Sequence, residues 1–258
     1  MRISYGKLRV PVHRIAGDDV LACDVSVEVL GENFLPAYTE GDNSQVVATD
    51  TMKNFILRES LGYDGTSLEG LLIHLGQRFL TTYPVMTALV LTARELRFDR
   101  LGARVYSRSS DDHGVATVAL DGEGVKDVRG GRHEMMLLKT RGSAFTRFAR
   151  DEYTTLPERG DRPLFIRLDA DWRYAGDDHV DSKAVRDHLA ATFDDFVSES
   201  IQHLVHEMGT RLLADRPELA EISFTAENHT RDPVGEDSGR KVYTDPFPAQ
   251  GLITLTLP

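Results

Sequence analysis

The sequence predicts an α+β fold in which helices pack against antiparallel β-sheets, arranged as two consecutive units. Three observations support this prediction. Apolar residues that alternate with polar ones, as Val25, Val27 and Val29 do, mark strands with one exposed face. Apolar residues three and four positions apart mark amphipathic helices. The order of predicted elements in the first half recurs in the second, although the residues show no clear repeat.

The first half is predicted to contain two strands, then two helices, and then two further strands. Its elements are, in order, two strands within 8–31, a turn over 41–44, the buried end of a strand over 46–48, a helix after Thr49, a helix after Ser67, and strands over 85–99 and 114–120. The helix after Ser67 has the clearest pattern, because its apolar residues recur at helical spacing: Leu71, Leu72, Leu75, Phe79 and Leu80.

The boundary between the halves is predicted in the stretch 121–134, which holds four glycines and mixed charge. We therefore divide the chain into units 1–128 and 129–258. The second unit is predicted to contain a strand ending at Lys139, a strand over 164–174, one long helix over about 183–214, a strand over 219–226, a loop over 230–249 and a strand over 251–257.

Composition excludes several classes of protein. The chain of 258 residues has a formal net charge of −11, which argues against nucleic acids and anionic membranes as partners. Its single cysteine, Cys23, cannot form an internal disulfide or a multi-cysteine metal site. The N-terminus lacks the apolar core of a signal peptide, and no window is apolar enough for a membrane span. We therefore expect a soluble cytoplasmic protein.

The stretch 39–54 combines a turn, a short apolar run and the start of a helix. Thr49 and Asp50 stand where the free N–H groups of the first helical turn attract negative charge. Such a position suits an anionic ligand, but the same residue types commonly serve only as helix caps. The stretch taken alone leaves both interpretations open.

Several further motifs along the chain, together with this stretch, occur in the order in which a known family has them. They are Tyr5-Gly6-Lys7, Tyr38-Thr39 with Asp42-Asn43-Ser44, Val47-Ala48-Thr49-Asp50 with Lys53-Asn54, Leu138-Lys139 with Phe145, Arg150-Asp151-Glu152-Tyr153-Thr154-Thr155-Leu156, Asp161-Arg162, Ser200-Ile201-Gln202 and Asn228-His229. Together they cover nearly the whole chain, and with them the sequence resembles the urate oxidase (uricase) family, in its bacterial type.

The resemblance implies a fold, an assembly and a reaction. The fold would be two tandem T-fold (tunnelling fold) units with helices on the outer face of antiparallel sheets, closed into an oligomeric barrel. The assembly would be a homotetramer with sites between subunits. The reaction would convert urate, dioxygen and water to 5-hydroxyisourate and hydrogen peroxide in purine catabolism, without a metal or organic cofactor.

The resemblance also implies which residues hold the purine. A flat anionic ring needs a planar donor fork, an amide and an aromatic face. The family's positions place these at Arg162, Gln202 and Phe145. Three further positions match family residues that bind substrate or orient dioxygen: Asp50, Ile201 and Asn228. Without the resemblance, Arg162 is more simply explained by an ion pair with its neighbour Asp161.

Oxidation without a cofactor needs a base that removes a proton from urate. The family uses a lysine bonded to a threonine, and Lys7 and Thr49 match those positions. Lysine is a base only in its neutral form, which burial beside other cations favours. Thr49 would also contact the substrate. In eukaryotic members the relay histidine follows the asparagine by two residues, whereas His229 follows Asn228 directly. Adjacent side chains of an extended chain point in different directions, so His229 is the weakest member of the predicted relay.

Two other functions remain open at this stage. One is a different T-fold purine or pterin enzyme, such as a zinc hydrolase, which a single cysteine serves poorly. The other is a non-catalytic purine-binding oligomer whose proton relay has decayed. Acidic and histidine clusters could also bind a metal, but they lack a third ligand at a suitable spacing: Asp177, Asp178, His179 and Asp181, and the pair His203 and His206.

Overall fold

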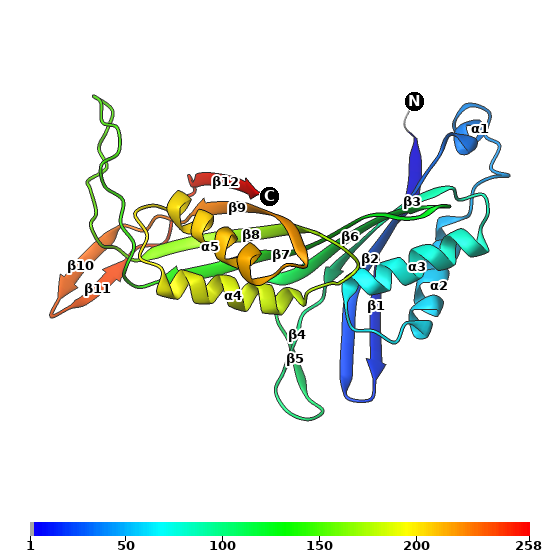
Figure 1. The fold of residues 1–258 in the computed structure, drawn as a ribbon, viewed down its shortest axis with the longest axis horizontal. Helices are drawn as coiled ribbons and strands as arrows, with labels where there is room; N and C mark the ends of the chain where they lie inside the picture. The colour runs from blue at the N-terminus through cyan, green and yellow to red at the C-terminus, as the bar shows by residue number, and fades with distance from the viewer. Residues whose placement is uncertain (1–2) are drawn as a thin grey trace. The chain divides into compact units, whose positions relative to one another are not determined.

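The computed structural model describes residues 3–258 and contains two compact units, Met1–Gly131 and Arg132–Pro258. We call them unit 1 and unit 2. Each combines antiparallel strands with helices, so the predicted α+β class is confirmed (Figure 1). The sequence analysis divided the chain after residue 128. No helix within residues 3–258 is long and apolar enough to span a lipid bilayer.

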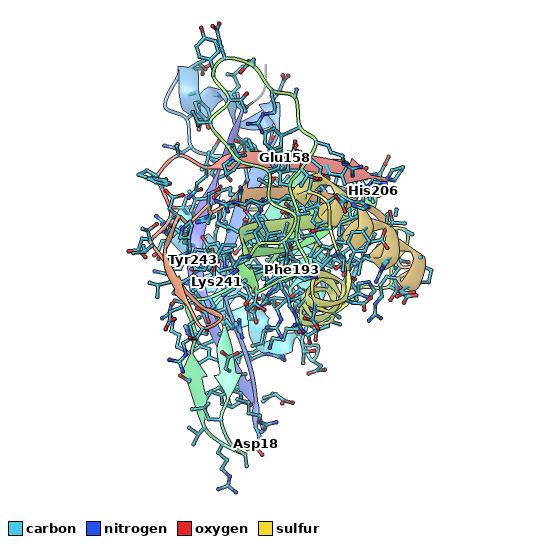
Figure 2. The ribbon with its side chains drawn as sticks, turned by 90° about the vertical axis from the view of Figure 1, so that its left-hand side faces the viewer. Asp18, Glu158, Phe193, His206, Lys241 and Tyr243 are labelled. Atoms are coloured by element: carbon cyan, nitrogen blue, oxygen red, sulfur yellow. The ribbon has the colours of Figure 1, made fainter. Side chains whose placement is uncertain are left out.

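Unit 1 is an antiparallel sheet with helices on one face. The sheet has the order β1-β2-β3-β6, and β6 is followed by β7. Its elements are β1 (Ser4–Ala16), β2 (Asp19–Leu30), η1 (Glu32–Phe34), α1 (Leu35–Thr39), α2 (Thr49–Glu59), η2 (Ser60–Gly62), α3 (Leu68–Thr82), β3 (Ala88–Glu95), β4 (Phe98–Arg100), β5 (Tyr106–Arg108) and β6 (His113–Asp121). Asp18 lies at the end of the β1–β2 hairpin (Figure 2), where Arg100 Nη2 donates to its carbonyl oxygen at 3.3 Å.

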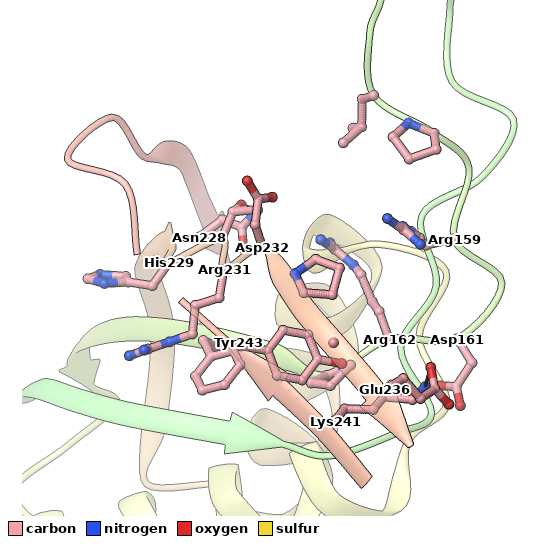
Figure 3. Close-up of a pocket in the computed structure, with 17 residues that line it drawn as sticks. Arg159, Asp161, Arg162, Asn228, His229, Arg231, Asp232, Glu236, Lys241 and Tyr243 are labelled. Carbon is pink, nitrogen blue, oxygen red and sulfur yellow. Dashed lines mark hydrogen bonds and ion pairs between the residues drawn. The ribbon is translucent and has the colours of Figure 1, made fainter. Parts of the chain in front are cut away.

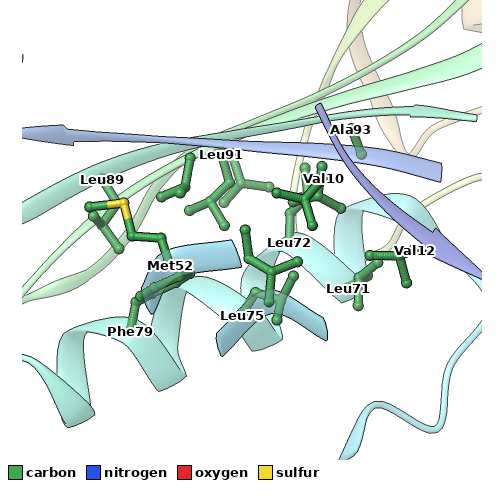
Figure 4. Packing of buried hydrophobic residues seen from close by; sticks show 14 of the residues in the cluster. Val10, Val12, Met52, Leu71, Leu72, Leu75, Phe79, Leu89, Leu91 and Ala93 are labelled. Carbon is green, nitrogen blue, oxygen red and sulfur yellow. The ribbon is translucent and has the colours of Figure 1, made fainter. Parts of the chain in front are cut away.

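The core of unit 1 lies between this sheet and the helices α2 and α3 (Figure 4). The predicted apolar stripe of α3 is buried, and Ser67 caps the helix by accepting a hydrogen bond from Gly70 N at 3.2 Å. The opposing residues come from alternate positions of three strands: Val25, Val27, Val29, Leu89, Leu91, Val118 and Leu120. The apolar side chains at helical spacing and those at alternate strand positions therefore pack together in one layer, as the sequence predicts.

Unit 2 repeats this plan with strands in the order β7-β8-β9-β12. Its elements are β7 (Gly124–Lys139), which begins in unit 1, β8 (Leu164–Tyr174), α4 (Ser182–Asp195), α5 (Ile201–Asp215), β9 (Leu219–Asn228), β10 (Pro233–Asp237), β11 (Arg240–Tyr243) and β12 (Gly251–Leu257). The predicted alternation of β8 is confirmed, since Leu164, Ile166, Leu168, Ala170 and Trp172 are all buried. Helices α4 and α5 lie along the strands in Figure 1.

The single helix predicted over 183–214 is wrong, because two helices occupy this range. Between them, Phe196 is extended, with φ −82° and ψ 117°. Ser198 pairs with Ser143 in a parallel β-bridge, and Ser200 caps the second helix by accepting from His203 N at 3.1 Å. The apolar stripe continues through both helices, so periodicity alone could not show the break. The break between the two helices depends on the backbone pairing of Ser198 with Ser143.

Three smaller predictions are corrected as well. The run 46–48 is irregular, because Val47 N donates to Tyr5 Oη instead of to a strand. The range 85–99 holds two strands, β3 and β4. The loop 230–249 contains the hairpin β10–β11, turned by Ser238 and Gly239 at φ 51° and 78°.

Candidate active site

Lys7 lies on β1 at a point where the backbone is tightly constrained. The residue before it, Gly6, faces β2 so closely that a Cβ atom would lie 1.9 Å from the carbonyl oxygen of Val27. The register with β2 shifts immediately after Lys7, and Arg9 has a positive φ of 53°. Such a bulge changes the direction of nearby side chains. Glycine and the bulge together fix the position of Lys7 on the sheet.

Tyr5 connects β1 to the start of α2. Its hydroxyl oxygen accepts a hydrogen bond from Val47 N at 3.0 Å, and its ring packs edge-on against Phe34 at 4.9 Å between centroids. Burial raises the pKa of the Tyr5 phenol above its usual range, so it stays neutral near pH 7. This contact holds the residues before α2 beside the strand that carries Lys7.

Thr49 and Asp50 form the first turn of α2, but neither caps it. The cap position is Ala48, and no side chain accepts a hydrogen bond there. The hydrogen bond from Lys53 lowers the pKa of Asp50, and the positive charge of Lys7 adds to this effect. Lys7 is therefore within electrostatic range of the helix start. Thr49 is exposed, and its hydroxyl makes no hydrogen bond within residues 3–258.

In unit 2, the segment 142–145 ties together two stretches that carry predicted site residues. Phe145 pairs with Arg159 through two backbone hydrogen bonds of 2.8 and 3.0 Å, and Arg162 N donates to Ser143 O at 2.9 Å. On its other side, Ala144 N donates to Ser198 O at 2.8 Å. Phe145, Arg162 and the start of α5 are thus attached to one short piece of backbone.

Arg162 is a half-buried cation without an acidic partner among the described residues. The carboxylate of Asp161 accepts a hydrogen bond from Gly142 N at 2.6 Å, so it is not the partner of Arg162. Arg162 Nε is buried and unpaired. Burial, with a smaller contribution from the charge of Arg159, lowers the pKa of Arg162. Because a buried N–H group without an acceptor is costly, this arrangement favours a bound anion.

Phe145 supplies a flat surface beside this cation. The Arg162 guanidinium carbon lies 6.0 Å from the Phe145 ring centroid. The ring also stacks on Phe148, with centroids 4.9 Å apart and planes 10° from parallel. Phe145 is only half-buried, so it is not simply a core residue.

Arg162, Asn228 and His229 line one cavity of about 220 Å³ in unit 2 (Figure 3). The other lining residues come from the segment before β8, the end of β9 and the β10–β11 hairpin: Leu156, Pro157, Arg159, Asp161, Pro163, Phe165, Thr230, Arg231, Asp232, Pro233, Gly235, Glu236, Lys241 and Tyr243. Polar and charged groups are common in this wall, as recognition of a polar anion requires.

Ile201 and Gln202 begin α5 and do not line this cavity. Ile201 is 4% exposed and belongs to the core of unit 2, whereas Gln202 is exposed on the first turn. Their connection to the other candidates is indirect, through Ser198 and the segment 142–145.

The candidates thus belong to different units, and of those in unit 2 only Arg162, Asn228 and His229 line the cavity. Lys7, Thr49 and Asp50 belong to unit 1, and the remaining six belong to unit 2. Thr230 is not among the site residues predicted from the sequence, although Asn228 Nδ2 donates to its hydroxyl oxygen at 3.0 Å. The alternation of side chains along β9 could have indicated this pair, because residues two apart share one side of a strand.

The clusters considered for a metal have other contacts. Asp181 caps α4 by accepting from Lys183 N at 2.9 Å, and the His203 ring packs against Phe196 at 4.7 Å. Within residues 3–258, no group of three or more His, Cys, Asp or Glu side chains is arranged to hold a metal ion.

Comparisons with known proteins agree with the resemblance found in the sequence. The sequence profile of the family described as Uricase matches residues 128–251. The uricase of Haloferax volcanii is 43% identical, over 91% of this chain and 90% of that protein. The uric acid degradation bifunctional protein PucL of Bacillus subtilis is 37% identical over 98% of this chain, which spans 57% of that protein's length. A crystal structure of urate oxidase from Bacillus sp. TB-90 superimposes with a TM-score of 0.92 at 31% identity, covering 99% of both chains.

Proposed function

Because this chain belongs to the uricase family, we propose that it oxidises urate with dioxygen and water to 5-hydroxyisourate and hydrogen peroxide. Urate gives two electrons to dioxygen, which becomes peroxide, and water supplies the added hydroxyl group. The proposed reaction uses no metal or organic cofactor. The expected T-fold architecture agrees with the match to urate oxidase structures.

This proposal rests mainly on one observation, the unpaired guanidinium of Arg162 at the wall of the cavity. Urate is flat and largely anionic, and a guanidinium offers two parallel N–H donors to such an edge. Arg162 has an unpaired buried Nε at the wall of the cavity, and no ion pair occupies its guanidinium within the described residues. A bound anion would supply the partner that Arg162 lacks.

The other substrate contacts are proposed from the family positions. Phe145 would stack on the purine, and its contact with Arg162 supports this role. Asn228 would orient dioxygen or water above the ring, which its position at the cavity supports. The Gln202 amide would bind the purine edge, Ile201 would contact the ring, and Asp50 would bind through its backbone.

Lys7 and Thr49 are the proposed base and its relay partner. The free Thr49 hydroxyl and the electrostatic contact between Lys7 and the start of α2 support this pairing. His229 remains the predicted third member, with less support. Its Nε2 lies 3.5 Å from Glu227 Oε2, and in Figure 3 its side chain points away from Arg162.

We also propose the assembly that the family implies, a homotetramer closed into a barrel with sites between subunits. The base group in unit 1 of one copy would meet the binding group in unit 2 of another. The proposed compartment is the cytoplasm, since the single cysteine, Cys23, is buried and has no disulfide partner. The zinc hydrolase and the decayed binding protein are not favoured, because the relatives are uricases and Lys7 and Thr49 are both present.

The test uses metal-chelated, flavin-free protein mixed with urate in air. We expect urate's ultraviolet absorption band to disappear, with one peroxide formed for each urate lost. Binding of urate without its loss would favour the non-catalytic alternative. Loss of urate without peroxide would point to a different reaction.

A further inference from the structure

The end of β9 has two sides with different surroundings. Phe224 and Ala226 are 2% and 0% exposed, so the even-numbered residues face the helices. Asn228, the last residue of β9, and Thr230 beyond it continue this series. The backbone stays paired there, since His229 N donates to Phe165 O at 3.0 Å. The alternation of an extended chain therefore places Asn228 and Thr230 on one side and His229 on the other.

The side-chain contacts agree with this division. Asn228 Nδ2 donates to Thr230 Oγ1 at 3.0 Å, and both residues line the cavity. His229 also lines the cavity, but its side chain has a different partner: His229 Nε2 lies 3.5 Å from Glu227 Oε2, and the same carboxylate accepts from Arg167 Nη1 at 3.1 Å. The nearest polar partner of the Asn228 side chain is thus the threonine two residues later.

In the structure, this contact turns the amide nitrogen of Asn228 toward Thr230. An amide has a donating nitrogen and an accepting oxygen, and an unrestrained amide can turn over. With one Nδ2 hydrogen given to Thr230, the amide oxygen and the second hydrogen remain for a ligand. The threonine hydroxyl, which accepts here, keeps its own proton for a further hydrogen bond.

We propose that Thr230 is a positioning residue that holds the Asn228 amide in one orientation for the reaction with dioxygen. The inference rests on the proposed function, and it gives a role to the threonine that stands two residues after Asn228, where eukaryotic members have the relay histidine. Thr230 acts through Asn228 and does not touch the reacting atoms. Its removal should therefore affect the chemical step more than the binding of the purine.

The experiment compares Thr230→Val, which removes the hydroxyl at nearly constant shape, with Thr230→Ser, which keeps it. We expect Thr230→Val to lower kcat about 3- to 10-fold, the effect of one lost neutral hydrogen bond. KM and the Kd for a non-reacting urate analogue should change less than about twofold. Thr230→Ser should retain most of kcat. Thr225→Val makes the same change on the other side of β9, outside the cavity, and should leave kcat unchanged.

A double-mutant cycle separates positioning from a general structural effect. In an Asn228→Ala background, Thr230→Val should cause no further loss of kcat, because the group that it positions is absent. Equal losses in both backgrounds would overturn the proposal, and so would an unchanged kcat in Thr230→Val. If the unsubstituted protein forms no peroxide from urate, the proposed function itself fails. Analogue affinity and far-ultraviolet circular dichroism show that each variant is folded.

Discussion

In unit 1, Lys7 and Thr49 stand on a backbone that leaves little freedom, whereas in unit 2 Arg162 stands at a cavity without an acidic partner. Gly6, the bulge after Lys7 and the Tyr5 hydrogen bond fix the first group. The second group contains a buried guanidinium nitrogen, Arg162 Nε, that has no hydrogen-bond acceptor. The comparison fits the proposed division of roles, in which unit 1 would supply the base and unit 2 would bind the anion.

Replacing the base should have the largest effect. We expect Lys7→Met to lower kcat by about 100-fold or more, the usual contribution of a general base. Binding of a urate analogue should remain nearly intact, because unit 2 carries the anion-binding residues. The measurements are steady-state kinetics and analogue binding by calorimetry. An equal loss of turnover and of binding would contradict the division between the units.

Replacing the cation should act on binding. We expect Arg162→Gln to weaken analogue binding by about 10- to 100-fold, as expected for lost hydrogen bonds to a charged group. Arg162→Lys keeps the charge but not the planar fork, so it should recover only part of the affinity. Analogue affinity that is unaffected in Arg162→Gln would show that the anion binds elsewhere.

The backbone constraint in unit 1 predicts a loss of stability. In Gly6→Ala, the new Cβ would lie 1.9 Å from Val27 O, so β1 and β2 must separate. We expect a loss of about 1–3 kcal/mol in the free energy of unfolding, typical of overpacking. The matched control is Gly176→Ala, whose Cβ would meet no atom within 4 Å. Chemical denaturation measures both, and equal stabilities would argue against the constraint.

His229 provides a smaller test of the same comparison. Because its side chain lies beside Glu227, we expect His229→Gln to lower kcat by less than about 10-fold, well below the general-base contribution. Steady-state kinetics of this variant and of Lys7→Met, measured together, gives the ratio of their two losses in kcat. Losses of similar size would place His229 in the relay with Lys7 and Thr49.

The smallest predicted effect concerns pH and lies outside both groups. A hydrogen bond of 2.8 Å between His133 Nε2 and Asp171 Oδ1 raises the pKa of His133, while Asp169 raises it further and Arg167 opposes it. The protonated histidine therefore stabilises the fold below about pH 6.5, its usual pKa. This stability is lost as the pH rises through the raised pKa. His133→Gln should flatten the pH dependence of the melting temperature over that range, and an unchanged slope would contradict the assignment.

Much of the fold follows from local pattern. The alternation over 164–174 and the helical spacing after Ser67 each predict an element that the structure contains. The break between α4 and α5 does not follow, because it depends on the pairing of Ser198 with Ser143, far away in sequence. No glycine or proline interrupts the apolar stripe there, and only Ser200 gives a local signal, as a helix cap.

Some features of the candidate site could likewise be predicted from the sequence, and others could not. Residue type and family position select Arg162 and Asn228, which the structure places at one cavity. The absence of an ion pair at Arg162 could not be predicted, since its neighbour Asp161 turns out to bind Gly142 N. The pairing of Asn228 with Thr230 could have been predicted, because it depends only on the alternation of an extended strand.

The most direct test of the proposed division uses two defective copies together. Lys7→Met and Arg162→Gln, each carrying a different affinity tag, are co-expressed, and the hybrid oligomer is purified through both tags. If unit 1 of one copy completes the site of unit 2 of another, hybrids contain some sites with both native residues. We expect the hybrids to form peroxide from urate at a rate well above the sum of the rates of the two parent proteins. A rate no higher than that sum would contradict the proposed division.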